Sequence, residues 1–524
     1  MSETRQSPLV DRRFHLPQDV LWYTFFFVVQ PPINRTRSAE HSALNDLRHL
    51  SQVCASWREL LLASSSLWGM AFELDQLLQN TCHWRNEVLR RTGNSLLNIH
   101  CHITTEGIGV LEIFLKSFLD EHWPRIRNLD IRLEGFSTIE GDRFMRRTIG
   151  AFRKPAVNLE SFTVNLGRYS KRTPVNARLF ADQAPVLQEF TGYNFRINPH
   201  SPWFSNLRVL RITCIWTAHE LLGTLASMPL LEILEFNEGG NGEGAAALLD
   251  PPVMGRDSLP RAVLSQLKEL DLDLGMALAK HVAVLEHLVP APGLQFDLKS
   301  DVLSLPSADL VAVQHVLCSY LQFSFKNELP NDVKIIIDRD YILVYLSKGS
   351  SKFTFELEFD HDVPDITTLL EPISSISLEN STKLSININS GALAATNTAL
   401  SRILLSSASI KELNTSAYSL QFPLSLSLTT DTVLFPILEL LRLDWPHDVR
   451  HVLDFLSRRY AQDAPIQLLD FGDCRAADSC DFRCLEQFNG LRVRWKDTGG
   501  STKEYTCGSG NAQVLDFTQN LPEP

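Results

Sequence analysis

The stretch that decides the fold is residues 14–74, which holds two short runs: LPQDVLWYTF at 16–25 and LSQVCASWR at 50–58. Pro17 follows the opening leucine, where a helix tolerates a missing N–H because its first donors have no intrahelical partner. Helical spacing then predicts one apolar stripe in each run: Leu16, Val20, Leu21, Phe25 and Val28, then Leu47, Leu50, Cys54, Trp57 and Leu61. Helices this small cannot bury such stripes against each other alone. They need a partner, either the rest of the chain or another protein.

The order of these features resembles the F-box. It comprises Leu16-Pro17, a hydrophobic helix ending near Phe25, a linker, Val53-Cys54, Trp57-Arg58 and a closing Leu67-Trp68. The resemblance covers about the first 75 residues and is greatest to the F-box proteins that fungi carry in many copies. Two departures are the bulk of Phe25-Phe26-Phe27 and the long polar linker at 31–45.

The resemblance implies docking on a Skp-type adaptor, which connects to a cullin and a RING subunit. By this resemblance the adaptor-binding residues would be Leu16, Pro17, Val20, Leu21, Phe25, Leu50, Val53, Cys54 and Trp57. Leu67-Trp68 is expected to join the box to the next part of the chain instead. The alternative is a plain helical hairpin with no docking role.

Length and net charge limit the domain organisation and the kinds of partner that the chain can have. A chain of 524 residues exceeds the size of one hydrophobic core, so several domains or a repeat array are expected. A net charge of −12 argues against a nucleic-acid groove. The acidic excess lies downstream of the first hundred residues and favours a basic patch on a target protein.

Compartment and membrane contact follow from other features. Nine cysteines without a framework suit free thiols in a reducing compartment. No signal peptide is visible at the N-terminus, and the apolar run at 20–29 is too short to cross a membrane. We expect a soluble cytoplasmic or nuclear protein.

Beyond the F-box-like segment, an amphipathic helix is expected at 83–91 and a first strand at 96–103. One pattern then recurs along the chain, with apolar residues at positions i, i+3 and i+5. Its copies are Ile126/Leu129/Ile131, Leu159/Phe162/Val164, Leu207/Leu210/Ile212, Leu231/Leu234/Phe236, Leu267/Leu270/Leu272, Leu438/Leu441/Leu443, Ile466/Leu469/Phe471 and a degraded Leu187/Phe190/Gly192.

Most copies are followed by an amphipathic helical segment, and a proline then stands before the next copy: Pro155, Pro185, Pro229, Pro436 and Pro465. Strand, helix and proline in this order resemble the leucine-rich repeat. The steps between copies vary, and the usual Asn or Cys ladder position is not evident. We expect an α/β fold in which a small helical F-box precedes an irregular leucine-rich-repeat-like solenoid. A non-repetitive α/β domain is the alternative.

The middle of the chain changes rhythm. A helix is expected at 308–321, and strands at 333–337, 341–346 and 352–359 form an antiparallel meander by their period of two. Either a small sheet is inserted there or the repeats degenerate. The expected organisation is a disordered N-terminus (1–13), the F-box (14–75), a first solenoid part (76–300), helix plus meander (301–430), last repeats (431–496) and a loose C-terminal tail (497–524).

Two segments offer candidate chemical sites, and each has a simpler explanation. The glycine-rich segment 239–245 lacks a following lysine and carries Glu243, so a surface loop is a better interpretation than a phosphate cradle. Cys474, Cys480, Cys484 and Cys507 lack the paired spacing of a zinc site. We expect no catalytic residues, no metal and no cofactor.

The resulting hypothesis is a non-catalytic substrate receptor of an SCF-type ubiquitin ligase, in which the repeats bind a target protein. Two alternatives are an interaction scaffold whose F-box acts outside a ligase, and an enzyme that uses the central meander as a pocket.

Overall fold

The computed structural model of the chain describes residues 16–30, 42–77, 82–103, 108–133, 149–165, 175–193, 195–213, 216–237, 259–275, 278–302, 307–326, 328–360, 366–389, 397–444, 449–472, 481–496 and 500–517. Over these residues the fold is mixed α/β, with a sheet whose strands are mostly parallel. The chain divides into two units, Met1–Leu207 and Arg208–Pro524.

Unit 1 begins with short helices: α1 (Gln18–Val29), α2 (Ala43–Leu50), α3 (Ala55–Ala63), α4 (Ser65–Met70) and α5 (His83–Thr92). Helix α5 confirms the helix expected at 83–91. The stripe expected between Leu47 and Leu61 is split over α2 and α3, because Cys54 is extended (φ −157°, ψ 169°) and a new helix starts after it. Of that stripe only Leu47 and Leu61 are buried.

Trp68 of α4 connects α3 and α5. Its ring is fully buried, its Nε1 donates to the Leu61 carbonyl oxygen at 2.9 Å, and the Arg91 guanidinium lies 4.4 Å from the ring centre. Strand β1 (Phe72–Glu73) then pairs in parallel with β2 (Leu97–Ile103). The segment expected as a separate F-box therefore continues directly into the sheet of unit 1.

The sheet of unit 1 is parallel and continues from β2 through β3 (Ile126–Leu133), β4 (Ser161–Asn165) and β6 (Glu189–Gly192). Strands β5 (Val175–Ala177) and β7 (Phe195–Ile197) form a separate pair. Helix α6 (Ile108–His122) lies between β2 and β3 in the chain. Short 3-10 turns complete the unit: η1 (Asp75–Leu77), η2 (Trp123–Arg125), η3 (Leu179–Asp182) and η4 (Pro202–Asn206).

Aromatic rings fill the core under these strands. The Phe162 ring stacks on Phe190 with 5.4 Å between ring centres, and Phe152 and Phe180 meet its edge at 5.2 Å. Trp203 covers Phe190 at 5.2 Å. All of these side chains are buried. Large rings in offset and edge-on contact give this unit a dense apolar core.

Unit 2 continues with parallel strands: β8 (Val209–Thr213), β9 (Ile233–Asn237), β11 (Glu269–Asp273), β13 (Gln295–Val302), and later β17 (Lys383–Ile388), β18 (Glu412–Ser416), β19 (Leu440–Asp444), β20 (Leu468–Asp470) and β21 (Arg492–Lys496). A separate pair joins β10 (Ala262–Leu264) and β12 (Leu288–Pro290).

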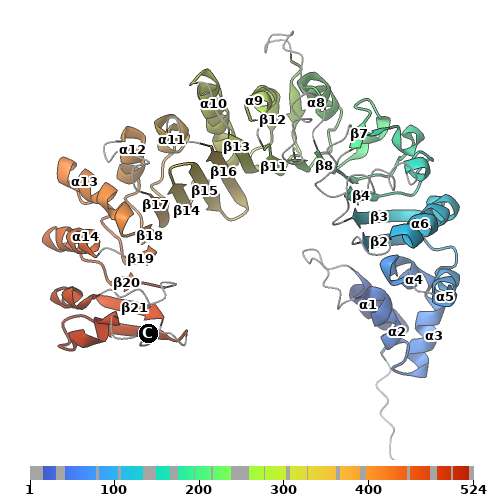
Figure 1. Cartoon of the computed structure of the whole chain (residues 1–524), viewed down its shortest axis with the longest axis horizontal. Helices are drawn as coiled ribbons and strands as arrows, with labels where there is room; N and C mark the ends of the chain where they lie inside the picture. The colour runs from blue at the N-terminus through green and yellow to red at the C-terminus, as the bar shows by residue number, and fades with distance from the viewer. Residues whose placement is uncertain are drawn as a thin grey trace, which may run out of the picture. The chain divides into compact units, whose positions relative to one another are not determined.

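Helices lie along one side of the strands of unit 2 (Figure 1). They are α8 (Ala218–Ala226), α9 (Leu278–His287), α10 (Ser307–Ser324), α11 (Ile366–Ser374), α12 (Thr398–Ser406), α13 (Gln421–Thr430), with the turn η6 (Tyr418–Leu420) before it, and α14 (Arg450–Ala461). Along most of these strands buried apolar side chains alternate with less buried polar ones.

The expected meander is confirmed as β14 (Asp332–Ile337), β15 (Tyr341–Lys348) and β16 (Ser351–Phe359), paired antiparallel. Its last strand, β16, pairs in parallel with β13, and its first strand, β14, pairs in parallel with β17. The meander is therefore built into the parallel ladder in reversed spatial order.

The expectation of a loose tail from residue 497 is wrong for residues 500–517. Strand β22 (Thr502–Thr506) pairs antiparallel with β21 and covers its open edge. Cys507, Leu515 and Phe517 are buried, close to the turns η7 (Arg483–Gln487) and η8 (Ala512–Leu515). The Gly- and Ser-rich composition hid these few buried residues. Residues 497–499 and 518–524 lie outside the described part, as does the N-terminal segment 1–13.

Candidate interaction surfaces

Helix α1 is apolar on two opposite faces. Leu21, Phe25 and Val29 recur every four residues and are buried, with Phe25 at 0% exposure. On the other side Val20, Tyr23 and Phe27 recur at helical spacing and are 43%, 58% and 70% exposed. A helix that is hydrophobic all round is normally buried. We call Val20, Tyr23 and Phe27, with Leu16 just before the helix, the outer stripe of α1.

Local contacts hold α1 and the neighbouring helices in place. Ser42 caps α2 by accepting from the Asn45 N–H, and its hydroxyl also donates to the Glu73 carboxylate. Glu73 in turn accepts from the Ala43 N–H at 3.2 Å, so strand β1 fixes the start of α2. The Trp57 ring meets the edge of Phe25 at 5.0 Å, which packs α3 on the buried side of α1.

The predicted adaptor-binding residues do not share one environment. Leu16, Pro17, Val20, Val53 and Cys54 are exposed, while Leu50 and Trp57 are partly buried. Leu21 and Phe25 belong to the core and offer no surface to a partner in this conformation. Pro17 occupies the N-cap position, one residue before the helix starts. The described residues therefore support a docking surface centred on the outer stripe of α1 and on Val53.

Two exposed residues were missed by the prediction. Tyr23 and Phe27 complete the outer stripe but were not among the predicted site residues. The signal was present, because Val20, Tyr23 and Phe27 follow the spacing i, i+3, i+7. It was hidden by the equally apolar stripe of Leu21 and Phe25 on the other side of the helix.

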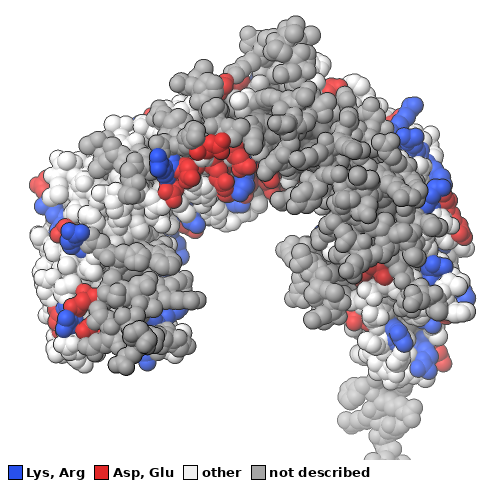
Figure 2. Space-filling model, in the orientation of Figure 1, with Lys and Arg blue, Asp and Glu red and all other residues white. Residues whose placement is uncertain are grey.

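The second candidate surface is the polar side of the sheet in unit 2. Register places one outward residue from each strand in a row: Arg211, Glu235, Asp271, Asp297, Thr354, Tyr345, Lys334, Ser385, Asn414, Arg442, Asp470 and Arg494. The row begins with the Arg211–Glu235 ion pair at 3.0 Å, continues through Asp271 and Asp297, and ends among arginines. Figure 2 shows acidic side chains gathered over the region of β11, β13 and β16.

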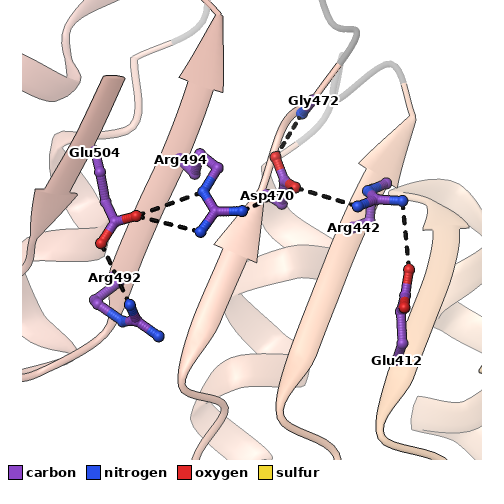
Figure 3. Close-up of polar contacts among 7 residues, drawn as sticks. All are labelled: Glu412, Arg442, Asp470, Gly472, Arg492, Arg494 and Glu504. Atoms are coloured by element: carbon purple, nitrogen blue, oxygen red, sulfur yellow. Dashed lines mark hydrogen bonds and ion pairs between the residues drawn. The ribbon is translucent and has the colours of Figure 1, made fainter. Parts of the chain in front are cut away.

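The arginine end of the row is an ion-pair network (Figure 3). Arg442 bridges Glu412 at 3.3 Å and Asp470 at 3.5 Å. Arg494 lies 3.9 Å from the same Asp470 and 3.3 Å from Glu504. Asp470 is buried and also accepts from the Gly472 N–H at 2.9 Å. Each buried or half-buried charge here has a partner, so the network links β18 to β22 and its charges are neutralised within the chain.

The acidic end is less balanced. Asp271 makes no ion pair with any described residue, although Asp297 and Glu235 face it across the neighbouring strands. Partial burial, together with the nearby charges of Asp297 and Glu235, raises the pKa of Asp271 to about 6. This crowding marks a place where additional positive charge is favourable.

Other sequence-derived sites find little support in the described residues. No group of three or more His, Cys, Asp or Glu side chains there is arranged to hold a metal ion. Cys484 is exposed and Cys507 is buried, while Cys474, Cys480 and the glycine-rich segment 239–245 lie outside the described residues.

Two clefts of about 300 and 360 Å³ lie among the described residues, and neither is lined by the central meander. The first is at the edge between α14 and β21, with Tyr460 and Phe488 in its wall. The second is in unit 1, beside Asp182 and Trp203. None of the helices in the described part of the chain has the length and apolar character to cross a membrane.

No protein-family model matches the chain, and no curated protein matches it in sequence. The case for a function therefore depends on the two surfaces, the outer stripe of α1 and the polar side of the unit 2 sheet.

Proposed function

We propose that the protein is a non-catalytic substrate receptor of an SCF-type ubiquitin ligase. Its N-terminal segment resembles an F-box and would dock on a Skp-type adaptor, through which a cullin and a RING subunit are recruited. The observation that carries this proposal is the outer stripe of α1. Val20, Tyr23 and Phe27 on the helix, and Leu16 just before it, are exposed, while the opposite face of the helix is already buried. An exposed apolar helix face of this kind is typical of protein interaction sites.

The rest of the fold supports the same proposal. Parallel strands alternate with helices through most of the chain, as in an irregular leucine-rich-repeat-like solenoid. Such architectures bind partners through an extended sheet surface and the loops beside it. In this account the polar side of the unit 2 sheet receives the target protein, and the receptor itself acts in the cytoplasm or nucleus.

The chemistry contributed by this chain would be proximity. A ligase that holds the target beside a ubiquitin-loaded E2 raises the effective concentration of a target lysine near the thioester. The receptor needs two binding surfaces for this task and no nucleophile or general base of its own.

Substitution of the outer stripe tests the proposal. Leu16→Asp with Phe27→Asp should cost at least about 2 kcal/mol of adaptor binding, because exposed apolar anchors dominate such interfaces. Both side chains are already in solvent in the free chain, so folding should be retained. Trp57→Ala is a poorer probe because Trp57 packs on the buried Phe25 ring. The measurement is capture of purified Skp-type adaptor by the full chain, with titration to obtain the affinity.

Val311→Asp with Leu428→Asp is the matched control. Val311 on α10 and Leu428 on α13 are 59% and 60% exposed in unit 2, and their replacement introduces the same two charges at other exposed apolar positions. It should leave adaptor capture unchanged. Wild-type capture by the Leu16/Phe27 double variant would contradict the proposal. Adaptor binding without cullin recruitment would instead favour the scaffold that acts outside a ligase.

A further inference from the structure

The acidic end of the unit 2 sheet is defined by strands β9, β11, β13 and β16. All charged residues of these strands are on the polar side, and eight carboxylates stand against two ammonium groups. The carboxylates are Glu235, Glu269, Asp271, Asp273, Asp297, Asp301, Glu356 and Glu358, and the ammonium groups are Lys299 and Lys352. We call this surface the acidic face.

The imbalance is local. At the other end of the same sheet, the described side chains of strands β18 to β22 include Glu412, Asp470 and Glu504 against Arg442, Arg492, Arg494, Lys496 and Lys503. Arginines and carboxylates there neutralise each other within the chain (Figure 3). The acidic face therefore does not follow from the average charge of the sheet. It is a separate surface with an excess of hydrogen-bond acceptors and negative charge.

The two lysines of the acidic face show how it receives an ammonium group. Lys352 Nζ lies 2.5 Å from Asp297 Oδ2 on the neighbouring strand. Lys299 Nζ lies 3.0 Å from Glu356 and 3.8 Å from Glu358, also across a strand pair. Carboxylates on adjacent strands thus hold a cationic group at ion-pair distance, as Glu235 also holds Arg211 of β8 at 3.0 Å, while Asp271 makes no ion pair with any described residue.

Thr354 provides an independent indication of a ligand. Its side chain is 7% exposed, and its Oγ1 has no hydrogen-bond partner among the described residues. Register places Thr354 between Asp297 and Tyr345 in the outward row, so the hydroxyl points to the acidic face. A buried hydroxyl without a partner is unfavourable. A donor on a bound ligand that reaches Oγ1 would satisfy it.

Unpaired acceptors continue beyond Thr354. Asn414 Oδ1, in the same row, and Asn387 Oδ1, on β17, are also buried without a hydrogen-bond partner in the described structure. The sheet thus presents carboxylates first and amide oxygens after them. Both accept hydrogen bonds, and both suit a ligand that carries many donors.

The spacing of the carboxylates distinguishes between kinds of cation. They stand on strands about 4.8 Å apart, so the acidic face extends about 14 Å across β9 to β16. A metal ion needs ligands that converge within about 2.5 Å, and the described residues contain no such group. An extended peptide advances about 3.3 Å per residue and would span this surface with about five residues. Lysine and arginine side chains supply the donors that the surface lacks.

We propose that the acidic face binds a lysine- or arginine-rich extended segment of the target protein. This inference rests on the proposed function only in that the basic segment belongs to a target protein. Binding of a basic segment by this face can be measured without the adaptor. The proposed function and the proposed peptide binding can therefore fail separately.

The experiment uses the full chain and a fluorescent twelve-residue peptide of alternating lysine and serine. Peptides of the same length with glutamate or glutamine in place of lysine are the comparisons. The lysine peptide should bind, with an affinity that falls as salt rises, and the other two should not. Asp271→Asn with Asp297→Asn should weaken binding about tenfold, equivalent to about 1.4 kcal/mol.

Glu379→Gln with Asp454→Asn is the charge-matched control. Both residues are exposed in unit 2 outside the acidic face, and the double change removes the same charge from the chain. It should leave lysine-peptide binding within twofold of wild type. Equal losses of lysine-peptide affinity in the two double variants would show that net charge alone explains the effect, and the proposal would be overturned. Absence of lysine-peptide binding by the wild-type chain would overturn it as well.

Thr354→Val separates binding from a structural role. It removes the unpaired hydroxyl with little change in volume, so the melting temperature should rise. Lysine-peptide affinity should fall about threefold, because one acceptor is lost. A rise in melting temperature without any loss of affinity would remove Thr354 from the site. If instead the Asp271/Asp297 variant changed the oligomeric state in light scattering, the occupant would be a second copy of this chain, and a target segment would be the wrong assignment.

Discussion

Asp271 links the electrostatics of the acidic face to the stability of the fold. Its pKa is raised from 3.8 to about 6 by partial burial and by Asp297 and Glu235. The ionised carboxylate is therefore less favourable in the folded chain than in the unfolded one. This destabilising contribution is fully present above pH 6 and disappears as the pH falls through about 6 toward 4, where both states bind the proton.

Asp271→Asn should consequently raise the melting temperature at pH 7.5 and have little effect near pH 4. Calorimetry at the two pH values measures the difference. Glu232→Gln is the control of opposite sign, because hydrogen bonds from Lys268 and Arg208 lower the pKa of Glu232. That substitution should not raise the melting temperature at pH 7.5. An Asp271→Asn variant whose melting temperature follows wild type at both pH values would show that the acidic face does not strain the fold.

At the scale of elements, α4 and the start of β2 approach so closely that only glycine fits between them. A Cβ on Gly69 would stand 2.4 Å from the Leu96 carbonyl oxygen, which belongs to the backbone and cannot turn away. Gly69→Ala should therefore shift α4 from the sheet and cost about 1–3 kcal/mol of stability, as overpacking usually does. Thermal unfolding measures the loss.

Gly223→Ala is the companion substitution, inside α8. A Cβ there meets no atom within 4 Å, so alanine should stabilise the helix by about 0.5–1 kcal/mol. The two glycines should thus give changes of opposite sign. A Gly69→Ala chain as stable as wild type would mean that α4 is not held against β2.

The strands were predictable from sequence wherever all three positions of the repeated pattern carry large apolar residues. Strand β18 escaped because Thr415 occupies the third position after Ile410 and Leu413. Strand β13 escaped because Gly293, which adopts φ 83°, occupies the first position. The residue at the middle position, Leu413 in β18 and Phe296 in β13, is nevertheless fully buried. A small or polar residue at one position weakens a three-point pattern without weakening the strand.

The candidate site was predictable only in part. The apolar character of α1 was evident from the sequence. Yet the consecutive residues Val20 and Leu21 have different environments, because Val20 is exposed and Leu21 is buried. A helix that is apolar all round has no polar face to indicate which side is covered. The acidic face was hidden for another reason. Asp297 and Thr354 lie far apart in sequence and become neighbours only because the meander enters the sheet in reverse order.

At the scale of the whole molecule, the two proposed surfaces belong to different units. The outer stripe of α1 lies in Met1–Leu207, and the acidic face lies in Arg208–Pro524. No residue contributes to both. Substitutions at sites without shared partners usually have additive effects on free energy. The receptor would therefore work as two independent contacts joined by one chain, and its contribution to ubiquitin transfer would require both at once.

The substitutions at the two surfaces can be compared separately and combined in one chain. The Asp271/Asp297 variant should capture adaptor as well as wild type, and the Leu16/Phe27 variant should bind the lysine peptide as well as wild type. The combined variant should show each loss at the size seen in the corresponding double variant. In a reconstituted ligase, transfer of ubiquitin to a test protein fused to the lysine-serine peptide should fall in both double variants. Loss of adaptor capture on neutralising the acidic face would show that the surfaces are coupled, and the independent-contact account would then be wrong.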